Sequence, residues 1–212
     1  MPVPPTAATP PPTSRFQEKR EAILGAAAEL FNEHGVKGAT LSDIAARVGL
    51  VTNSVTYYYR KKEDLAKACF LRAIEVFSRI AEQAGLEATL EARVHAYFRL
   101  HVELLAQLER GEHPPLVHFN DVQALPESHA EAVIEAYNNM FRRVRQLLRS
   151  AETASLSRAD LNARAYYLLS LSHWVRVWAG RYETTDYARI SRRAADIVLR
   201  GVIDQPIAVA IV

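Results

Sequence analysis

The sequence predicts an all-α protein of about nine helices, on three observations. Apolar residues recur at helical spacing through most of the chain, and this spacing, not alternation between apolar and polar residues, dominates the pattern. Glycines and prolines stand between the periodic segments, where helices end. A chain of 212 residues is long enough for one large domain or two modest ones.

The N-terminal segment 1–14, "MPVPPTAATPPPTS", is the first part of the chain and is rich in proline. Proline lacks an amide donor and disfavours helical backbone in the residue before it. We therefore expect a flexible, partly polyproline-II tail, with a ligand for a proline-binding module as the alternative. The segment has no basic start and no apolar core, so we expect no secretory signal and a cytoplasmic protein.

The first helix is expected over Phe16–His34, where Ile23, Ala27 and Leu30 fall on one stripe. Gly35 follows it and is well placed to end the helix in a left-handed conformation.

Two short helices are expected next. Thr40 is a predicted N-cap with Asp43 at the capping-box position, and Gly49 ends the helix that follows. Another short helix is expected over about Thr52–Tyr59. Apolar residues of the two helices would hold them at a fixed angle: Leu41, Ile44, Ala45, Val48, Leu50 and Val55.

The remaining chain predicts longer helices separated by glycine and proline. "RGEHPPLVHF" interrupts the periodicity at Gly111, Pro114 and Pro115, and Pro126 starts a new segment. The inward face predicted after Pro126 is Val133, Ile134, Tyr137, Phe141, Val144 and Leu148. The expected helices are about Lys62–Ala84, Glu87–Glu109, Leu116–Val122 (a short piece), Glu127–Glu152, Arg158–Gly180 and Thr185–Ile203.

The composition and residue spacing exclude several classes of function. The net charge is only +2, so any surface that binds nucleic acid must be a local patch. The one cysteine, Cys69, lies in an apolar stretch and is expected to be buried and inert. No HxxxH or CxxC spacing, phosphate-binding glycine loop or acid–base motif is present, so we expect no metal, no cofactor and no enzyme. No apolar run approaches the roughly 20 residues that span a bilayer.

The pair of short helices, "TLSDIAARVGLVTNSVTYYY", has the pattern of a helix-turn-helix. The second helix would enter the major groove, where the amide of Asn53 matches adenine. Tyr59 should turn inward, while Tyr57 and Tyr58 face the DNA and Lys62 meets a phosphate. The predicted DNA contacts are Thr40, Ser42, Thr52, Asn53, Ser54, Thr56, Tyr57, Tyr58 and Lys62.

Residues 16–70 resemble the DNA-binding domain of the TetR family of bacterial transcriptional regulators, through "ILGAAAELFNEHGVKGATLSDIAARVGL" and "YYYRKKEDL". Three positions depart from the family pattern, and all lie in the recognition helix. Val51 replaces a capping serine, Asn53 a small residue and Thr56 an aromatic one. Because Val51 cannot cap, Thr52 is an alternative cap that would shift the start of the helix. The operator sequence therefore does not carry over from the family.

The resemblance implies a helical C-terminal domain that binds a small molecule and dimerises through its last two helices. The first of those helices is apolar on more than one face, with Leu161, Ala165 and Leu168 on one of them, and the last helix places Ile190, Ala194, Ile197 and Gly201 on one stripe. Ordinary intramolecular core is the alternative explanation. Polar and aromatic residues interrupt the apolar stripes between about residues 65 and 178, as in a small-molecule site, although each alone is also explained as core. The predicted ligand contacts are Tyr97, His101, His118, Tyr137, Asn138, Tyr166, His173 and Trp174.

The expected organisation is a tail at 1–14, a DNA-binding domain at 15–61, a ligand-binding and dimerisation domain at 62–205, and an unassigned tail at 206–212. The expected function is a homodimeric repressor that a small, mainly apolar ligand releases from an inverted-repeat operator. The alternative is a DNA-binding architectural or activator protein of the same fold that has no physiological ligand.

Overall fold

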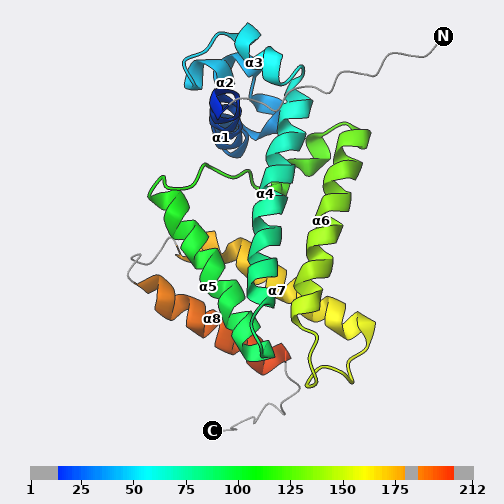
Figure 1. Ribbon diagram of the computed structural model, residues 1–212. Coiled ribbons are helices and arrows are strands. Elements are labelled where there is room, and N and C mark those ends of the chain that lie inside the picture. Colours follow the sequence, from blue (N-terminus) through cyan, green and yellow to red (C-terminus); the bar gives the residue numbers. More distant parts are fainter. Residues whose placement is uncertain (1–13, 180–185, 203–212) are drawn as a thin grey trace, which may run out of the picture.

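The computed structural model describes residues 14–179 and 186–202, with side chains described for 14–172 and 186–200. Within these ranges every regular element is a helix, as the sequence predicts (Figure 1). The predicted tails at 1–14 and 206–212 lie outside the described residues, apart from Ser14. The elements are α1 (Ser14–Gly38), α2 (Leu41–Arg47), α3 (Thr52–Tyr58), α4 (Lys62–Gly85), α5 (Leu90–Glu109), the 3₁₀ helix η1 (Phe119–Ala124), α6 (Glu127–Leu147), α7 (Arg158–Ala179) and α8 (Tyr187–Val202).

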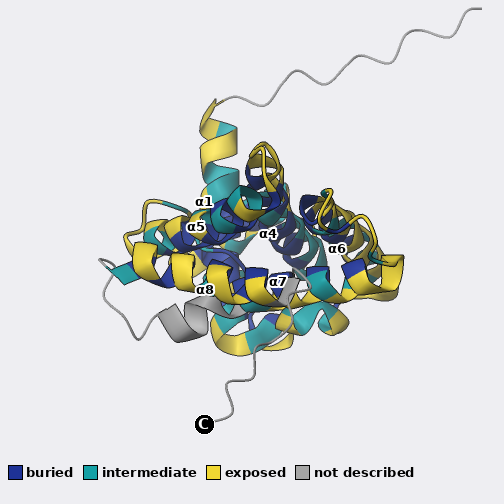
Figure 2. Cartoon of the chain, turned by 90° about the horizontal axis from the view of Figure 1, so that it is seen from below, coloured by how far each residue is buried: buried dark blue, intermediate teal, exposed yellow. Residues whose placement is uncertain are grey.

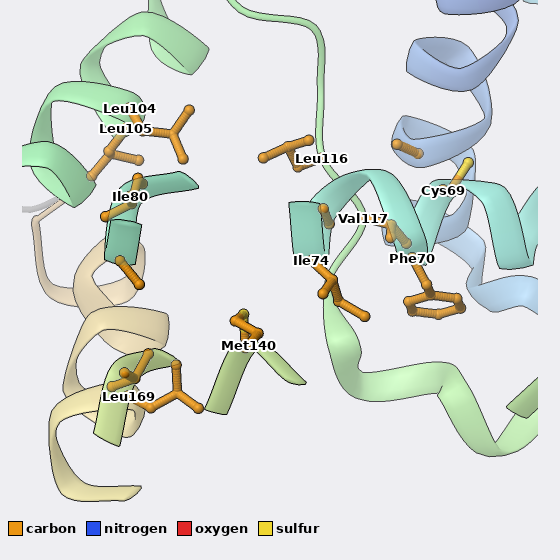
Figure 3. Packing of buried hydrophobic residues seen from close by; sticks show 14 of the residues in the cluster. Cys69, Phe70, Ile74, Ile80, Leu104, Leu105, Leu116, Val117, Met140 and Leu169 are labelled. Carbon is orange, nitrogen blue, oxygen red and sulfur yellow. The ribbon is translucent and has the colours of Figure 1, made fainter. Parts of the chain in front are cut away.

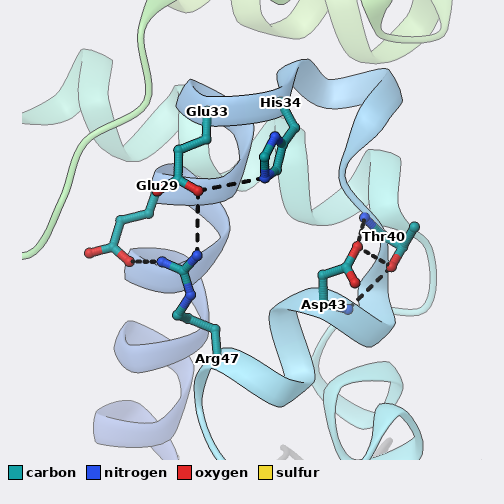
Figure 4. A network of polar contacts seen from close by, with 6 residues as sticks. All are labelled: Glu29, Glu33, His34, Thr40, Asp43 and Arg47. Atoms are coloured by element: carbon teal, nitrogen blue, oxygen red, sulfur yellow. Dashed lines mark hydrogen bonds and ion pairs between the residues drawn. The ribbon is translucent and has the colours of Figure 1, made fainter.

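Helices α1–α3 form one end of the molecule, which we call the head (Figure 1). Gly35 interrupts α1 with the positive φ that the sequence predicts, 73°, but its ψ of 164° lies far from that of the left-handed helical conformation, and α1 resumes for a short turn to Gly38. The predicted capping box is confirmed, because Thr40 Oγ1 accepts from Asp43 N and Asp43 Oδ2 accepts from Thr40 N (Figure 4).

The head is held together by buried apolar residues of α2 and α3, above all Ile44, Ala45 and Val55. Polar contacts on its surface add to this. Arg47 of α2 binds Glu29 and Glu33 of α1, at 2.9 and 3.4 Å (Figure 4). Such exposed pairs contribute little, about 0–1 kcal/mol each, so apolar burial sets the angle between the helices.

The start of α3 differs from one sequence-based alternative. Val51 is the N-cap residue and makes no capping bond through its side chain, while Thr52 is the first residue of the helix. Thr52 therefore does not act as a cap, and the start of the helix is not shifted. The first turn is closed by the backbone instead, since Ser54 N donates to Val51 O at 2.9 Å.

Helices α4–α8 form the rest of the molecule, which we call the body, and α4 is its central element (Figure 1). One end of α4 packs against α1 of the head, and its length packs against α5 and α6. Buried side chains from α4 meet others from α5, α6 and α7 in one continuous core, including Ile80, Leu105, Met140 and Leu169 (Figure 3). A movement of α4 would therefore displace packed side chains in both the head and the body.

Several predicted helix boundaries are displaced, and the short piece predicted over Leu116–Val122 is the 3₁₀ helix η1 at Phe119–Ala124. Helix α5 begins at Leu90 instead of Glu87, because Thr89 caps it by accepting from Ala92 N at 3.1 Å. Helix α6 ends at Leu147 instead of Glu152, where the buried hydroxyl of Thr153 donates to Leu148 O at 2.5 Å. Both ends are fixed by a threonine hydroxyl that replaces a backbone partner.

The predicted inward face of α6 is right at five positions and wrong at one. Val133, Phe141, Val144 and Leu148 are buried and Tyr137 is half-buried, but Ile134 is 53% exposed. Val133 takes the inward position, and its neighbour is turned by about 100° around the helix, onto the outer side.

Among the described residues, no helix is long and apolar enough to cross a membrane.

Candidate functional site

The outer face of α3 carries the residues that the sequence assigns to DNA. Asn53 is exposed and Tyr57 is 76% exposed, whereas Val55 on the inner face is fully buried. Thr52, Ser54 and Thr56 lie at the half-buried borders, and the Thr56 hydroxyl donates to Asn53 O at 3.0 Å. Thr40 and Ser42 are exposed at the start of α2. The amide of Asn53 is thus presented to the surroundings on a helix whose other face is anchored.

The three consecutive tyrosines differ in burial, and the prediction for Tyr59 is confirmed. Tyr59 is buried, which raises the pKa of its hydroxyl, and the Arg20 guanidinium carbon lies 6.0 Å from its ring centre. Tyr58 is half-buried because its ring packs on Phe16 of α1, with 4.8 Å between ring centres. Phe16 also meets the edge of Tyr57, at 6.3 Å.

The sequence predicts Phe16 at the start of the first helix but predicts no contact for it. The signal was one aromatic residue in the otherwise polar "SRFQEKR". Its ring fixes the first turn of α1 beside the end of the recognition helix.

Lys62 is engaged within the protein. Its ammonium group donates to Lys37 O at 3.0 Å and to Ala39 O at 2.9 Å, which closes the end of α1 onto the start of α4. An ammonium group has three N–H donors, so one remains for a phosphate. The neighbouring cations Arg60 and Lys61 are exposed.

Replacing Lys62 with alanine should weaken both the fold and the binding of DNA. Loss of two charged hydrogen bonds at a half-buried site should lower the free energy of unfolding by about 1–2 kcal/mol. Loss of one phosphate contact should reduce the slope of log affinity against log salt by about one. Urea unfolding and fluorescence anisotropy over a salt series measure the two effects. An unchanged salt slope would limit Lys62 to a structural role.

A cluster of rings fills the middle of the body and includes three predicted ligand residues, Tyr97, His101 and Tyr137. Tyr97 and His101 lie 4.3 Å apart between ring centres, and His101 Nδ1 donates to Tyr97 O at 2.8 Å. Tyr97 is fully buried, which raises its pKa well above the usual range, and its hydroxyl lies 3.3 Å from Ser172 Oγ.

The cluster continues through two phenylalanines toward Tyr137. Phe77 stacks on His101 at 5.6 Å, Phe119 packs on Phe77 at 5.9 Å, and Tyr137 meets Phe119 at 5.7 Å. Phe77 and Phe119 are not among the residues predicted for the site, because nothing in the local sequence indicates that α4, α5, η1 and α6 converge there. We call Tyr97, His101, Phe77, Phe119 and Tyr137 the ring cluster.

The other predicted ligand residues lie elsewhere. Tyr166 is 54% exposed and stacks on Phe141 at 4.2 Å, and Asn138 is exposed on α6. His118 is half-buried between α5 and η1. The side chains of His173 and Trp174 lie outside the described residues.

A groove of about 640 Å³ lies apart from the ring cluster, between α5 and α8. Small apolar residues line it together with polar and charged ones, among them Arg99, Arg110 and Arg192. Arg99 pairs with Glu103 at 2.9 Å and Arg110 with Glu112 at 2.7 Å, so much of the positive charge is neutralised. The groove therefore has no strong preference for an anion.

Cys69 is buried, as predicted, and burial raises the pKa of its thiol to about 12. A thiol with such a pKa is protonated at neutral pH and is a poor nucleophile. Across the described part of the chain, no group of three or more histidine, cysteine, aspartate or glutamate side chains is placed to hold a metal ion.

Comparison with known proteins agrees with this geometry. Residues 23–69 match the family model "Bacterial regulatory proteins, tetR family". The HTH-type transcriptional repressor KstR2 of Rhodococcus jostii RHA1 is 25% identical over 205 residues, which cover 91% of this chain and 97% of that protein. The likeness thus extends through both the head and the body.

Solved structures share the fold. AibR, in complex with isovaleryl coenzyme A and operator DNA, has a TM-score of 0.62 at 18% identity, covering 83% of this chain and 97% of that one. FadR from Bacillus subtilis, in complex with stearoyl-CoA, has a TM-score of 0.62 at 17% identity, covering 85% and 97%. Residues 23–69 thus carry the DNA-binding domain of the TetR family of bacterial transcriptional regulators, and the whole chain is similar in sequence to one transcriptional repressor.

Proposed function

We propose that the chain is a repressor that binds an inverted-repeat operator as a homodimer and leaves it when a small, mainly apolar ligand binds the body. The observation that carries the DNA-binding half is the exposed outer face of α3, with Asn53 and Tyr57, on a helix anchored by buried Val55. A helix presented in this way can enter the major groove with its first turn at the base edges.

The ring cluster supports the ligand-binding half of the proposal. Its aromatic faces are apolar, and the hydroxyl of Tyr97 and the ring of His101 add polar groups at one end. Apolar walls with a few polar groups are usual in small-molecule sites. AibR and FadR, which share the fold, are described in complex with coenzyme A thioesters. The acyl part of such a thioester, or a flat aromatic compound, would suit this lining.

The alternative function is a DNA-binding architectural or activator protein without a physiological ligand. One observation favours it: the rings of Tyr97, His101 and Phe77 pack directly on one another, so the cluster is filled by the protein's own side chains. A ligand would have to displace these rings. Titration of an operator complex with isovaleryl-CoA, stearoyl-CoA and flat aromatic compounds separates the two functions, since only the ligand-responsive repressor releases DNA.

Dimerisation through α7 and α8 is the third part of the proposal. Leu161, Ala165 and Leu168 are buried within the chain, so this stripe of α7 belongs to its own core. The exposed faces retain large apolar side chains, and exposed residues alternate with buried ones along α8 (Figure 2). These exposed side chains are Tyr166, Tyr167 and Ile197. A helix pair with apolar residues on its outer face is suited to a four-helix bundle with a second copy.

The apolar stripe predicted along α8 is buried at one position and exposed at another. Ile190 is buried and Ile197 is 62% exposed, although the two residues lie two turns apart on nearly the same face. Helix α5 packs along α8 from Tyr187, whose hydroxyl donates to Glu109, to Asp196, which lies 3.3 Å from His95, and Ile197 lies outside this contact.

We infer a cytoplasmic location from the proposed DNA-binding function.

Replacing Asn53 with alanine should change which DNA sequence is preferred. Removal of a bidentate contact to adenine costs about 1–3 kcal/mol of discrimination, so preference at one position of each half-site should relax by about tenfold or more. Binding of all sequences at low salt should persist, because phosphate contacts remain. Selection from a random duplex pool, with wild type and variant in parallel, measures this. Gln146, exposed on α6, provides the control Gln146→Ala, which should select the wild-type sequence.

A further inference from the structure

The segment between α5 and α6 passes directly beneath the head (Figure 1). Asn32 of α1 binds it at two points through one side-chain amide. Its Nδ2 donates to Leu116 O at 2.9 Å, and its Oδ1 accepts from His118 N at 2.8 Å. One side chain of the head thus satisfies both a carbonyl and an N–H of the body.

A second contact between the head and this segment lies four residues further along α1, and we call these contacts ties. Asp121 of η1 accepts from Val36 N at 2.7 Å, where α1 is interrupted at Gly35. Hydrogen bonds to an ionised carboxylate are roughly twice as strong as those between neutral groups. The approach is so close that a Cβ atom on Gly35 would lie 2.8 Å from Asp121 Oδ2.

A third tie joins the segment to α1 through the central helix. Arg72 of α4 donates to Leu24 O at 3.3 Å, binds Glu21 at 3.1 Å and donates to Pro115 O. Its side chain is only 14% exposed, so solvent screens these contacts less than it screens surface pairs. Head, segment and α4 therefore meet at one polar junction.

Phe119 lies between the residues that make the first two ties. Its ring belongs to the ring cluster, with centres 5.9 Å from Phe77 and 5.7 Å from Tyr137. Its neighbours in sequence, His118 and Asp121, contact the head. A displacement of Phe119 cannot occur without moving the backbone that carries both ties, because it directly follows His118 and only one residue separates it from Asp121.

We propose that Asn32 and Asp121 are positioning residues for DNA recognition. They fix the orientation of the head on the body, and Phe119 makes that orientation depend on the packing of the ring cluster. The covalent route between head and body runs through Arg60 and Lys61, just before α4, and Lys62 holds that junction against Lys37 O and Ala39 O. The ties at Asn32 and Val36 join the head to a different element of the body, so they restrict rotation about that junction. The inference rests on the proposed function, because in a dimer the head orientation sets the spacing of the two half-sites.

The test compares operators that differ only in the spacing of their half-sites. The selected inverted repeat and the same repeat with one base pair inserted at its centre are titrated with wild type and with the double variant Asn32→Ala, Asp121→Ala. Wild type should prefer the selected spacing. In the double variant, the ratio of the affinities for the two operators should fall by about tenfold, which is the effect of losing about one charged hydrogen bond. The single variant Asp121→Asn, in which Asn32 is unchanged and an acceptor oxygen remains for Val36 N, should keep most of the wild-type preference for the selected spacing.

Glu29→Gln is the matched control, since it removes an ion pair of comparable length within the head and leaves the ties intact. It should keep the wild-type preference. Equal preference in wild type and the double variant, with both folded by circular dichroism, would overturn the inference.

A DNA-independent measurement separates failure of the inference from failure of the proposed function. Residual dipolar couplings of backbone amides report how the head is oriented on the body. Wild-type couplings from α2 and α6 should fit one alignment tensor, and those of the double variant should require two. One tensor for both proteins would overturn the inference, whether or not an operator is found. Two tensors in the variant, with no duplex bound by wild type, would support the ties and reject the proposed function.

Discussion

Replacing Ile197 with aspartate is expected to leave the chain folded and to turn the dimer into a monomer. Ile197 is 62% exposed on α8, so a charge there costs the isolated chain little. In a four-helix bundle between two copies, two carboxylates would face each other or an apolar surface, and hot-spot losses at such sites exceed about 2 kcal/mol per residue. With one half-site per particle, operator affinity should fall by about 100-fold or more.

Sedimentation velocity measures the change in mass, and anisotropy titration measures the change in affinity. Ile134→Asp is the matched control, because Ile134 is the same residue type at 53% exposure on α6. It should remain dimeric and bind the operator as wild type does. A dimeric Ile197→Asp protein would refute the proposed interface, and a monomeric Ile134→Asp protein would move it to α6.

Replacing Gly35 with alanine should be among the most destabilising single substitutions in the head. The φ of 73° and ψ of 164° at Gly35 belong to a region that is nearly exclusive to glycine, where another residue costs about 1–3 kcal/mol. The new Cβ would also lie 2.8 Å from Asp121 Oδ2, so the bond from Val36 N to that carboxylate would lengthen or break. We expect the free energy of unfolding to fall by about 2–4 kcal/mol in total.

Urea unfolding followed by circular dichroism measures this loss. Gly38 provides the control, because it lies in α1 with no positive φ and an added Cβ would meet only His34 Cβ, at 3.4 Å. Gly38→Ala should change the stability by less than about 1 kcal/mol. If both substitutions cost the same, neither the backbone conformation of Gly35 nor its contact with Asp121 stabilises the fold.

Local rules of sequence predicted the head well. The capping box of Thr40 and Asp43, the positive φ of Gly35 and the buried Tyr59 each depend on residues within a few positions of one another. Helical periodicity likewise placed the long helices of the body. The displaced ends of α5 and α6 followed from Thr89 and Thr153, whose hydroxyls compete with backbone partners, and the cap at Thr89 could have been identified from sequence.

Contacts between residues far apart in the chain could not be predicted from the sequence. Lys62 binds carbonyls 23 and 25 residues away, and Asp121 binds an amide 85 residues away. No periodic pattern encodes such pairs, because they depend on how the helices pack. For the same reason the sequence named Tyr97, His101 and Tyr137 for the ring cluster but missed Phe77 and Phe119. Whether these residues bind a ligand remains a prediction.

If α3 of two copies reads two major grooves of one duplex, an interference footprint with duplexes that carry 7-deazapurines will show it, because these bases lack the N7 acceptor that faces the major groove. We expect two identical sets of major-groove contacts, about 34–36 Å apart or a multiple of that distance, with the contact to one adenine per half-site lost in Asn53→Ala. A single set of contacts, an unchanged pattern in Asn53→Ala, or no binding of any duplex at low salt would contradict it.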